Sequence, residues 1–362
     1  MAFLDSTVLN DFQAREATNE KREANYGMLN LAKDSTSAVD YVPPSVQEVL
    51  ATSSNARNAK IPVLKDQTVT VNTTPGFANI PVNLGETDSY YFTAYDVFSG
   101  FRFYPAAHAE NQVDGQWYFD QVMRNVLKAC AATTDDIVET VMEARKTQVL
   151  NYTDQISQGD GTFNFNTGDD TLEISKDAQK DTMFYNLGQL MIANQLPGPY
   201  RIVTSPAGLV VNDAESMKYN TQNSKNISWQ QLYMPDDRRY ISDQIATSAN
   251  FNGFFVRDGA LGLYENYPYD FRNGTRIAGK EWSISDVELP YMKMRANVYV
   301  NSEATDGTAL VTPGTRTDLK MTHFEEMALW FRFYVVYRYN SDLTTRAQDI
   351  VKIEGLTTNP GV

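Results

Sequence analysis

The sequence has little of what most catalytic and metal-binding sites require. Its 362 residues include one cysteine, Cys130, and two histidines, His108 and His323. A single cysteine can form neither an internal disulfide nor a cysteine-based zinc cluster, and no catalytic or metal-binding motif surrounds either histidine. We therefore expect no enzymatic activity, no metal and no cofactor. Cys130 lies among alanines and is expected to be a small buried hydrophobic residue.

Basic residues and long hydrophobic runs are also scarce. The 31 lysines and arginines are outnumbered by 45 aspartates and glutamates, so the formal net charge is −14. Such a surface should repel a phosphate backbone. The most apolar tract, residues 327–339, is interrupted by two arginines and falls short of the roughly 20 residues that cross a bilayer. The first residues lack a secretion signal. We therefore expect neither tight binding of duplex DNA nor insertion into a membrane. We expect the protein to be synthesised in the cytosol.

Residues 1–60 are poor in apolar side chains and do not look like the start of a compact domain. Two short helices are expected, one around Phe12 and one after Pro44, with residues 33–38 irregular between them. The segment is either a disordered tail or an arm that becomes ordered only against a neighbouring subunit. We favour the arm.

A long two-stranded loop is expected over residues 61–105. Residues 67–73 and 90–104 alternate with period two, which is typical of strands. The turn-forming stretch between them carries Phe77 and Ile80 as exposed apolar candidates. Because an isolated hairpin is only marginally stable in water, a loop of this length needs another surface to lie on.

The strongest helical pattern lies in residues 116–150, where Val122, Val126 and Cys130 repeat every four residues. At 1.5 Å per residue a continuous helix would be about 50 Å long. Residues 133–136, Thr-Thr-Asp-Asp, are typical of a helix start, so two helices with a break there are the alternative.

The rest of the chain mixes helices and strands, and its alternating tracts predict half-buried strands in the last third. The expected elements are a hairpin at 151–175, helices at 177–194 and 207–218, and strands at 200–204, 253–257, 292–301, 330–339 and 350–353.

This order of elements resembles the major capsid proteins of tailed bacteriophages, which have the Hong Kong 97 type fold, an α+β fold. The resemblance covers nearly the whole chain and is carried by the order and lengths of the elements. Within it, the strand RIVTSP at residues 201–206 opens an α/β layer, and ARKTQVLN at residues 144–151 closes the long helix.

The resemblance implies a division of the chain into the parts of that fold. These are an N-terminal arm at 1–60, an extended loop at 61–105, a spine helix with a peripheral-domain hairpin at 106–176, an axial domain at 177–275, peripheral-domain β-strands at 276–340, and a C-terminal strand returning to the axial domain at 341–362.

The resemblance also implies a function. Such a protein is structural and self-assembles as hexamers and pentamers into the icosahedral head that encloses the double-stranded DNA of a tailed phage. It is located in the virion after assembly in the host cytoplasm, and it has no membrane partner. Portal and scaffold proteins are implied partners, with decoration or head–tail proteins as further ones.

Contacts between subunits are expected from apolar residues of the arm and loop and from two basic residues. Some members of the family join the extended loop to a neighbour through a lysine and an asparagine. Lys65 lies in the matching loop, but no asparagine or catalytic carboxylate aligns with it, so no crosslink is predicted. Arg102 is expected to form an ion pair between subunits. The contact candidates are Val8, Phe12, Val46, Leu50, Lys65, Phe77, Ile80 and Arg102.

Two other classes of protein remain open at this point. The tyrosine, tryptophan and carboxylate content is compatible with a β-rich carbohydrate-binding or carbohydrate-acting protein, which would need two acids about 5 to 10 Å apart in an aromatic-lined cleft. A phage tail or baseplate protein is the third hypothesis, and the expected long helix makes it less favoured.

Overall fold

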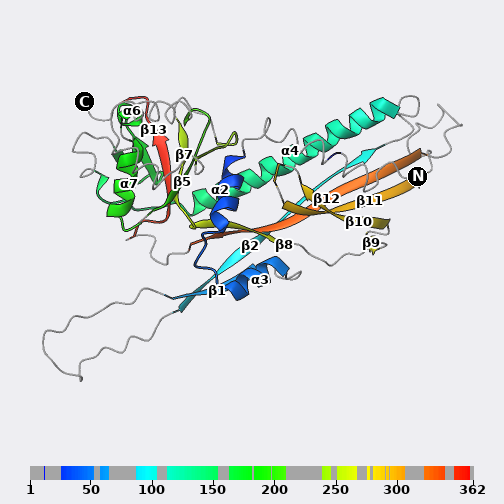
Figure 1. Cartoon of the computed structure of the whole chain (residues 1–362), viewed down its shortest axis with the longest axis horizontal. Coiled ribbons are helices and arrows are strands. Elements are labelled where there is room, and N and C mark those ends of the chain that lie inside the picture. Colours follow the sequence, from blue (N-terminus) through cyan, green and yellow to red (C-terminus); the bar gives the residue numbers. More distant parts are fainter. Residues whose placement is uncertain are drawn as a thin grey trace, which may run out of the picture.

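A computed structural model of the chain describes two β-sheets and a set of helices (Figure 1). The residues that it describes are 12, 26–52, 58–64, 87–103, 112–153, 163–181, 183–196, 198–208, 239–245, 251–266, 275–277, 280–289, 291–292, 294–305, 322–338 and 346–358.

The larger sheet, here called the long sheet, has seven strands in the order β1-β2-β12-β11-β10-β9, with β8 pairing β12. All of its pairings are antiparallel. Its strands are β1 Asn58–Leu64, β2 Thr87–Phe103, β8 Leu261–Asn266, β9 Thr275–Ile277, β10 Lys280–Leu289, β11 Met294–Thr305 and β12 Thr322–Tyr337.

The second sheet, here called the small sheet, has six strands in the order β3-β4-β13-β7-β5-β6. It shares a core with the helices α6, Ala178–Asp181, and α7, Met183–Ala193. The apolar residues of α7 recur every three or four positions, so one face of that helix is buried. The strands are β3 Phe163–Asn166, β4 Thr171–Ile174, β5 Tyr200–Thr204, β6 Arg239–Ile241, β7 Asn252–Arg257 and β13 Ile350–Gly355.

The long helix α4, Gln112–Ala144, is continuous and runs along the long sheet (Figure 1). The two-helix alternative is therefore wrong. The Thr-Thr-Asp-Asp stretch does not start a helix, because Thr134 and Asp135 point into the core: the Thr134 hydroxyl donates to the Cys130 carbonyl at 2.8 Å. Cys130 is buried, as predicted. The helix ends six residues before the expected boundary at Leu150.

The N-terminal region differs most from the expectation. The structure has a helix, α2, at Gly27–Thr36, where the sequence analysis expected irregular chain at residues 33–38. A second helix, α3, spans Pro44–Thr52 and begins at the predicted proline. Residues 26–52 are therefore folded onto their own chain, and the expectation of an arm ordered only by a neighbour is wrong for them.

The physical reason is a short apolar stripe that the composition of the segment conceals. Four side chains of α2 are fully buried and belong to the same core as the long sheet. One turn and a half of helix suffices for such a stripe once β8 and α4 cover it. The four residues are Met28, Leu29, Leu31 and Ala32.

Two boundaries of the expected division also shift. The hairpin of β3 and β4 was expected with the peripheral strands, but β4 pairs in parallel with β13 and so belongs to the small sheet. The strand β8 was expected in the axial part, but it pairs with β12 of the long sheet. Pairing between distant parts of the chain decides both placements. The C-terminal strand β13 lies in the small sheet beside β7.

The predicted strand at residues 292–301 is present as β11, but it is not half-buried. Met294, Ala296 and Val298 are buried on one face, as the alternation predicts. On the other face Asn297 and Tyr299 are also buried, at 3% and 6% exposure.

Candidate assembly surfaces

Strands β1 and β2 form a two-stranded ribbon that extends beyond the rest of the long sheet (Figure 1). Residues 94–103 of β2 pair with β12, whereas residues 87–93 pair with β1. Within the described residues, no strand pairs with the second edge of the 87–93 stretch. A two-stranded ribbon is marginally stable in water. Helix α3 contacts β1, and Phe92 is buried edge-on against Tyr337, so the chain itself covers part of the ribbon, and the second edge of residues 87–93 is the part we consider for a further contact.

An exposed aromatic side chain, Phe98, stands on the face of β2 opposite to the one that packs on α4. Phe101 and Phe103, at odd positions, contact Phe119 and Tyr118 of α4. Because side chains alternate along a strand, Phe98 points the other way. It is 70% exposed, although it stacks on Trp330 with ring centroids 5.6 Å apart and planes inclined by 3°.

Charged residues hold the Trp330 ring in place beneath Phe98. The indole N–H of Trp330 donates to Asp96 Oδ1 at 3.1 Å, and Arg332 donates to the same oxygen at 2.6 Å. The Arg332 guanidinium also lies over the Trp330 ring, 5.5 Å from its centroid. We call Asp96, Phe98, Trp330 and Arg332 the Phe98 shelf. Trp330 and Arg332 are themselves buried, at 7% and 6% exposure, so the exposed part of the shelf is the Phe98 ring, which stands over charges that compensate each other.

A second exposed aromatic pair lies near the start of α4. Trp117 is 63% exposed and Tyr118 is 41% exposed, whereas the next residue, Phe119, is buried. Large exposed aromatic side chains are enriched in contact surfaces.

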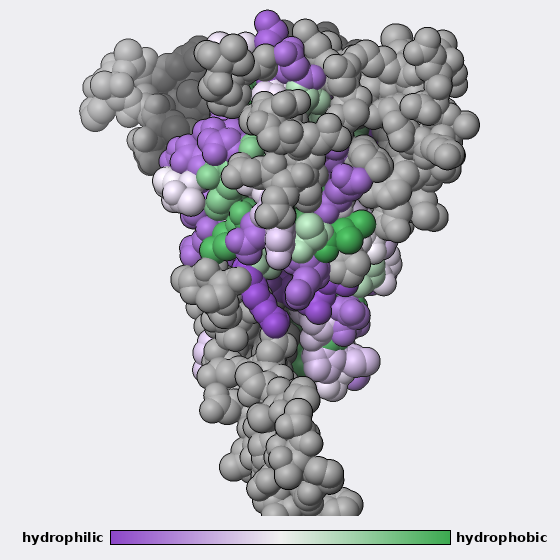
Figure 2. Space-filling view, turned by 90° about the vertical axis from the view of Figure 1, so that its left-hand side faces the viewer, coloured by the Kyte–Doolittle hydropathy of each residue, from purple (hydrophilic) through white to green (hydrophobic). Residues whose placement is uncertain are grey.

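The end of the molecule at which the small sheet lies is different. Figure 2 shows this end, and the coloured part of its surface is mostly hydrophilic, with hydrophobic residues in separate spots. The described part of this face therefore carries no broad hydrophobic patch.

The structure places four of the eight contact candidates in its described part. Phe12 is buried and packs edge-on against Phe119, with centroids 6.4 Å apart. Leu50 is buried, and its carbonyl accepts a hydrogen bond from Asn266. Val46 packs against the same core. Their apolar surface is covered by their own chain, so the expectation that they contact a neighbour is corrected for Phe12 and Leu50.

Arg102 forms its ion pair within the chain, with Glu326 on the neighbouring strand β12. Cross-strand pairing brings these two side chains together on one face of the sheet. The structure thus gives Arg102 a partner that the sequence analysis sought on another subunit. Val8, Lys65, Phe77 and Ile80 lie outside the described residues.

Sequence analysis missed Phe98 and Trp117 as surface candidates, and Trp330 as the buried ring beneath Phe98. The alternation expected over residues 90–104 contained the signal for Phe98. The stacking of Phe98 on Trp330 depends on the register between β2 and β12, which no local pattern reveals.

Within the described part of the chain, no cluster of three or more histidine, cysteine, aspartate or glutamate residues could hold a metal ion. Burial raises the pKa of the Cys130 thiol, which keeps it protonated and unreactive.

No helix among the described residues combines the length and the hydrophobicity needed to cross a membrane.

Comparison with known proteins gives structural likenesses only. No protein-family model matches the sequence, and no curated protein matches it. The fold is similar to a structure from Mycobacterium phage Che8, with a TM-score of 0.45 and 8% identity over 87% of this chain and 89% of that one. It is similar to the capsid of Ralstonia phage GP4, with a TM-score of 0.40 and 8% identity over 89% and 91%. It is also similar to an encapsulin complex from Synechococcus elongatus, with a TM-score of 0.39 and 8% identity over 87% and 88%. The function is therefore argued from the molecule's own geometry.

Proposed function

We propose that this chain is the structural subunit of a closed protein shell, the major capsid protein of a tailed phage. The observation that carries the proposal is the β1–β2 ribbon, which extends from the long sheet. Along the chain, the ribbon follows the helices α2 and α3 and precedes the long helix α4. After α4 the chain forms most of the small sheet, then the strands β8 to β12 of the long sheet, and it returns to the small sheet with β13.

A ribbon of this kind suits a subunit that tiles a shell. Each copy would lay its ribbon on a neighbour, so that every subunit both gives and receives a contact. Closing a shell lets many such weak contacts form at the same time, so their binding free energies add up. The Phe98 shelf, which lies on the same strand as the ribbon, is the apolar surface we assign to such a contact.

The assembly and partners that we propose are those implied by the resemblance to major capsid proteins of tailed phages. Subunits would form hexamers and pentamers and enclose double-stranded DNA in an icosahedral head, with portal and scaffold proteins as partners during assembly in the host cytoplasm. The formal charge of −14 suits a container whose wall must not bind the DNA that moves through it. Residues 26–52 are not assigned to a contact with a neighbouring subunit, because they pack on their own chain.

The carbohydrate alternative has less support. Asp96, on the same face of β2 as Phe98, is hydrogen-bonded to the Trp330 indole and paired with Arg332. A carboxylate with these partners within its own chain is not placed opposite a second acid across an aromatic-lined cleft.

Electron microscopy of the purified full-length chain tests the proposal. We expect closed shells, or rings of five and six subunits, in negative stain, and fast-sedimenting particles in analytical ultracentrifugation. Discrete monomers at high protein concentration, across a range of salt that includes conditions screening the negative charge, would overturn the proposal.

A further inference from the structure

One buried carboxyl group connects three separate parts of the chain. Asp135 of α4 is fully buried, and its Oδ1 accepts the backbone N–H of Leu29 of α2 at 2.8 Å. Its Oδ2 is hydrogen-bonded to the hydroxyl of Ser242, which is also fully buried and directly follows β6. The backbone N–H of Ser242 donates in turn to the carbonyl of Thr204 in β5 at 3.1 Å. The long helix, α2 and the small sheet therefore meet at Asp135.

The groups that contact Asp135 are neutral, and the charged residue that acts on it from its own helix is negative. The donors are the Leu29 N–H, the Met28 N–H and the Ser242 hydroxyl. Asp136, which is exposed, adds its negative charge. Burial is the larger effect, and together they raise the pKa of Asp135 to about 6.

The charged residues of the neighbouring elements have other partners. On α2, Lys33 is hydrogen-bonded to the Met292 carbonyl and lies 3.5 Å from Glu265. Asp34 accepts a hydrogen bond from Tyr240.

Two further acidic residues belong to the elements that meet at Asp135. Beyond β6, Asp243 is exposed. Glu139, one turn further along α4, has its own pKa raised by burial and by the charges of Asp135 and Asp136.

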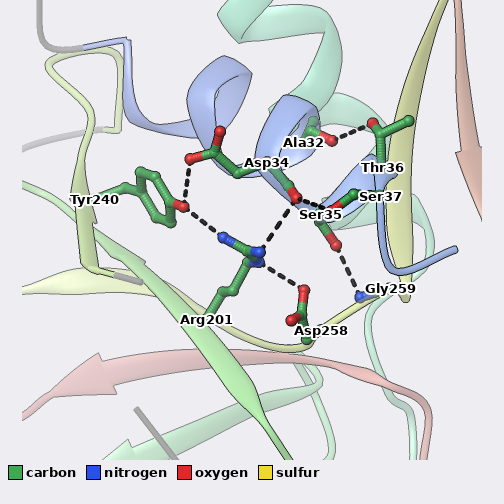
Figure 3. Close-up of polar contacts among 9 residues, drawn as sticks. All are labelled: Ala32, Asp34, Ser35, Thr36, Ser37, Arg201, Tyr240, Asp258 and Gly259. Carbon is green, nitrogen blue, oxygen red and sulfur yellow. Dashed lines mark hydrogen bonds and ion pairs between the residues drawn. The ribbon is translucent and has the colours of Figure 1, made fainter. Parts of the chain in front are cut away.

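The opposite side of α2 is fastened by a second set of polar contacts (Figure 3). Arg201 of β5 donates to Asp258 at 2.7 Å, to the Tyr240 hydroxyl at 2.6 Å and to the Asp34 carbonyl at 3.2 Å. Tyr240 donates to the Asp34 carboxylate at 2.7 Å. These contacts fix α2 to the small sheet. Asp135 adds a contact between α4, α2 and the residue after β6, beside the Glu143–Lys352 ion pair that joins α4 to β13.

We infer that Leu29, Asp135 and Ser242 form a three-element joint that tightens when the carboxyl group of Asp135 takes up a proton. The ionised carboxylate is buried with neutral donors and beside Asp136, so its charge opposes closure of the joint. The protonated carboxyl group removes that charge and keeps both contacts: one oxygen accepts the Leu29 N–H, and the O–H donates to the Ser242 hydroxyl oxygen. Mild acid would thus fix α2, α4 and the small sheet more firmly to one another.

Hydrogen exchange of the full-length chain, measured by mass spectrometry, tests the joint. After correction for the intrinsic pH dependence of exchange, amides of α2 and of residues 239–245 should be about tenfold better protected at pH 5 than at pH 7.5. Asp135→Asn keeps the shape and both contacts without a charge. Its protection should be high and equal at the two pH values. The matched control is Asp136→Asn, which removes the exposed neighbouring carboxylate; it should keep the pH dependence and move its midpoint to a lower pH, because the charge of Asp136 raises the pKa of Asp135.

A second variant covers the case in which Asp135→Asn does not fold. Ser242→Ala removes one donor from the carboxylate, which should move the midpoint of the pH dependence to a higher pH. Equal protection of α2 in the wild type at pH 5 and pH 7.5 would overturn the inference, as would an unchanged pH dependence in Asp135→Asn. The joint lies within one chain, so these outcomes do not depend on whether the chain forms shells.

Discussion

At the scale of single residues, Asp135 makes the folding free energy depend on pH. Its pKa is raised from 3.8 to about 6, chiefly by burial. A carboxyl group with a raised pKa in the folded state stabilises the fold fully below its unfolded pKa, and this contribution is lost as the pH rises through the folded pKa.

We therefore expect Asp135→Asn to gain stability relative to the wild type as the pH rises from 4.5 to 8. Two pKa units correspond to up to about 3 kcal/mol. Urea denaturation at a series of pH values measures the difference between the two proteins. Parallel stability curves would contradict the prediction, and Asp136→Asn is the control for loss of a carboxylate on the same helix.

Arg201 and Arg102 both form ion pairs, but their burial differs. The side chains of Arg201 and Asp258 are 9% and 8% exposed, whereas that of Arg102 is 57% exposed. Burial opposes the charge of Arg201, but Asp258 and Tyr240 outweigh it and hold its pKa above the ordinary value. Removing one partner of a buried pair leaves an uncompensated charge.

Arg201→Ala should lower the free energy of unfolding by about 3–5 kcal/mol, and Arg102→Ala by less than about 1 kcal/mol. Chemical denaturation at pH 7 compares the two variants directly. The double variant Arg201→Met with Asp258→Leu should recover part of the loss, because it buries no charge. Similar losses for Arg201→Ala and Arg102→Ala would show that burial does not govern these pairs.

At the scale of elements, local periodicity predicted the long helix and the strands β2, β5, β7, β11, β12 and β13, but it missed β8 and β10. Pairing between strands did not follow from it. The alternation of β11 and the four-residue repeat of α4 are properties of contiguous sequence. The parallel pairing of β4 with β13 joins residues about 180 positions apart, and it moved the hairpin into the small sheet. The local Thr-Thr-Asp-Asp pattern made Asp135 resemble a helix-start residue. Its partners Leu29 and Ser242 are distant along the chain, so the local pattern could not reveal its buried contacts. Burial of α2 likewise depends on covering elements that the local pattern does not contain.

Helix α2 begins at Gly27, where it approaches β6 closely. A Cβ at Gly27 would overlap the carbonyl group of Ile241, which is backbone and cannot move aside as a side chain can. We expect Gly27→Ala to lower the free energy of unfolding by about 1–3 kcal/mol, through overpacking. Asn30→Ala, on the exposed side of α2, should be neutral or slightly stabilising because alanine favours helix. Thermal unfolding of the two variants checks this, and equal midpoints would contradict the close approach.

At the scale of the whole molecule, polar contacts join the described elements, and the described part of the face in Figure 2 carries no broad hydrophobic patch. The long and small sheets are held together through α2, by Asp135 on one side and by Arg201 and Tyr240 on the other. Assembly would therefore draw on the features that extend from this body, the β1–β2 ribbon and the Phe98 shelf. Phe98 can be altered without disturbing either core, because it is 70% exposed, whereas Phe92 of the ribbon is buried in the core of the long sheet.

Phe98→Asp is expected to separate folding from assembly. The variant replaces an exposed ring with a charge on a surface that we assign to a neighbouring subunit, and a desolvated unpaired charge opposes association. Its near-ultraviolet circular dichroism and thermal unfolding should stay close to those of the wild type, whereas fast-sedimenting particles should be lost in analytical ultracentrifugation. Asn30→Asp adds the same charge at an exposed polar position and should assemble like the wild type. If Phe98→Asp assembles as well as Asn30→Asp, the Phe98 shelf is not a subunit contact, and the ribbon must find its surface elsewhere.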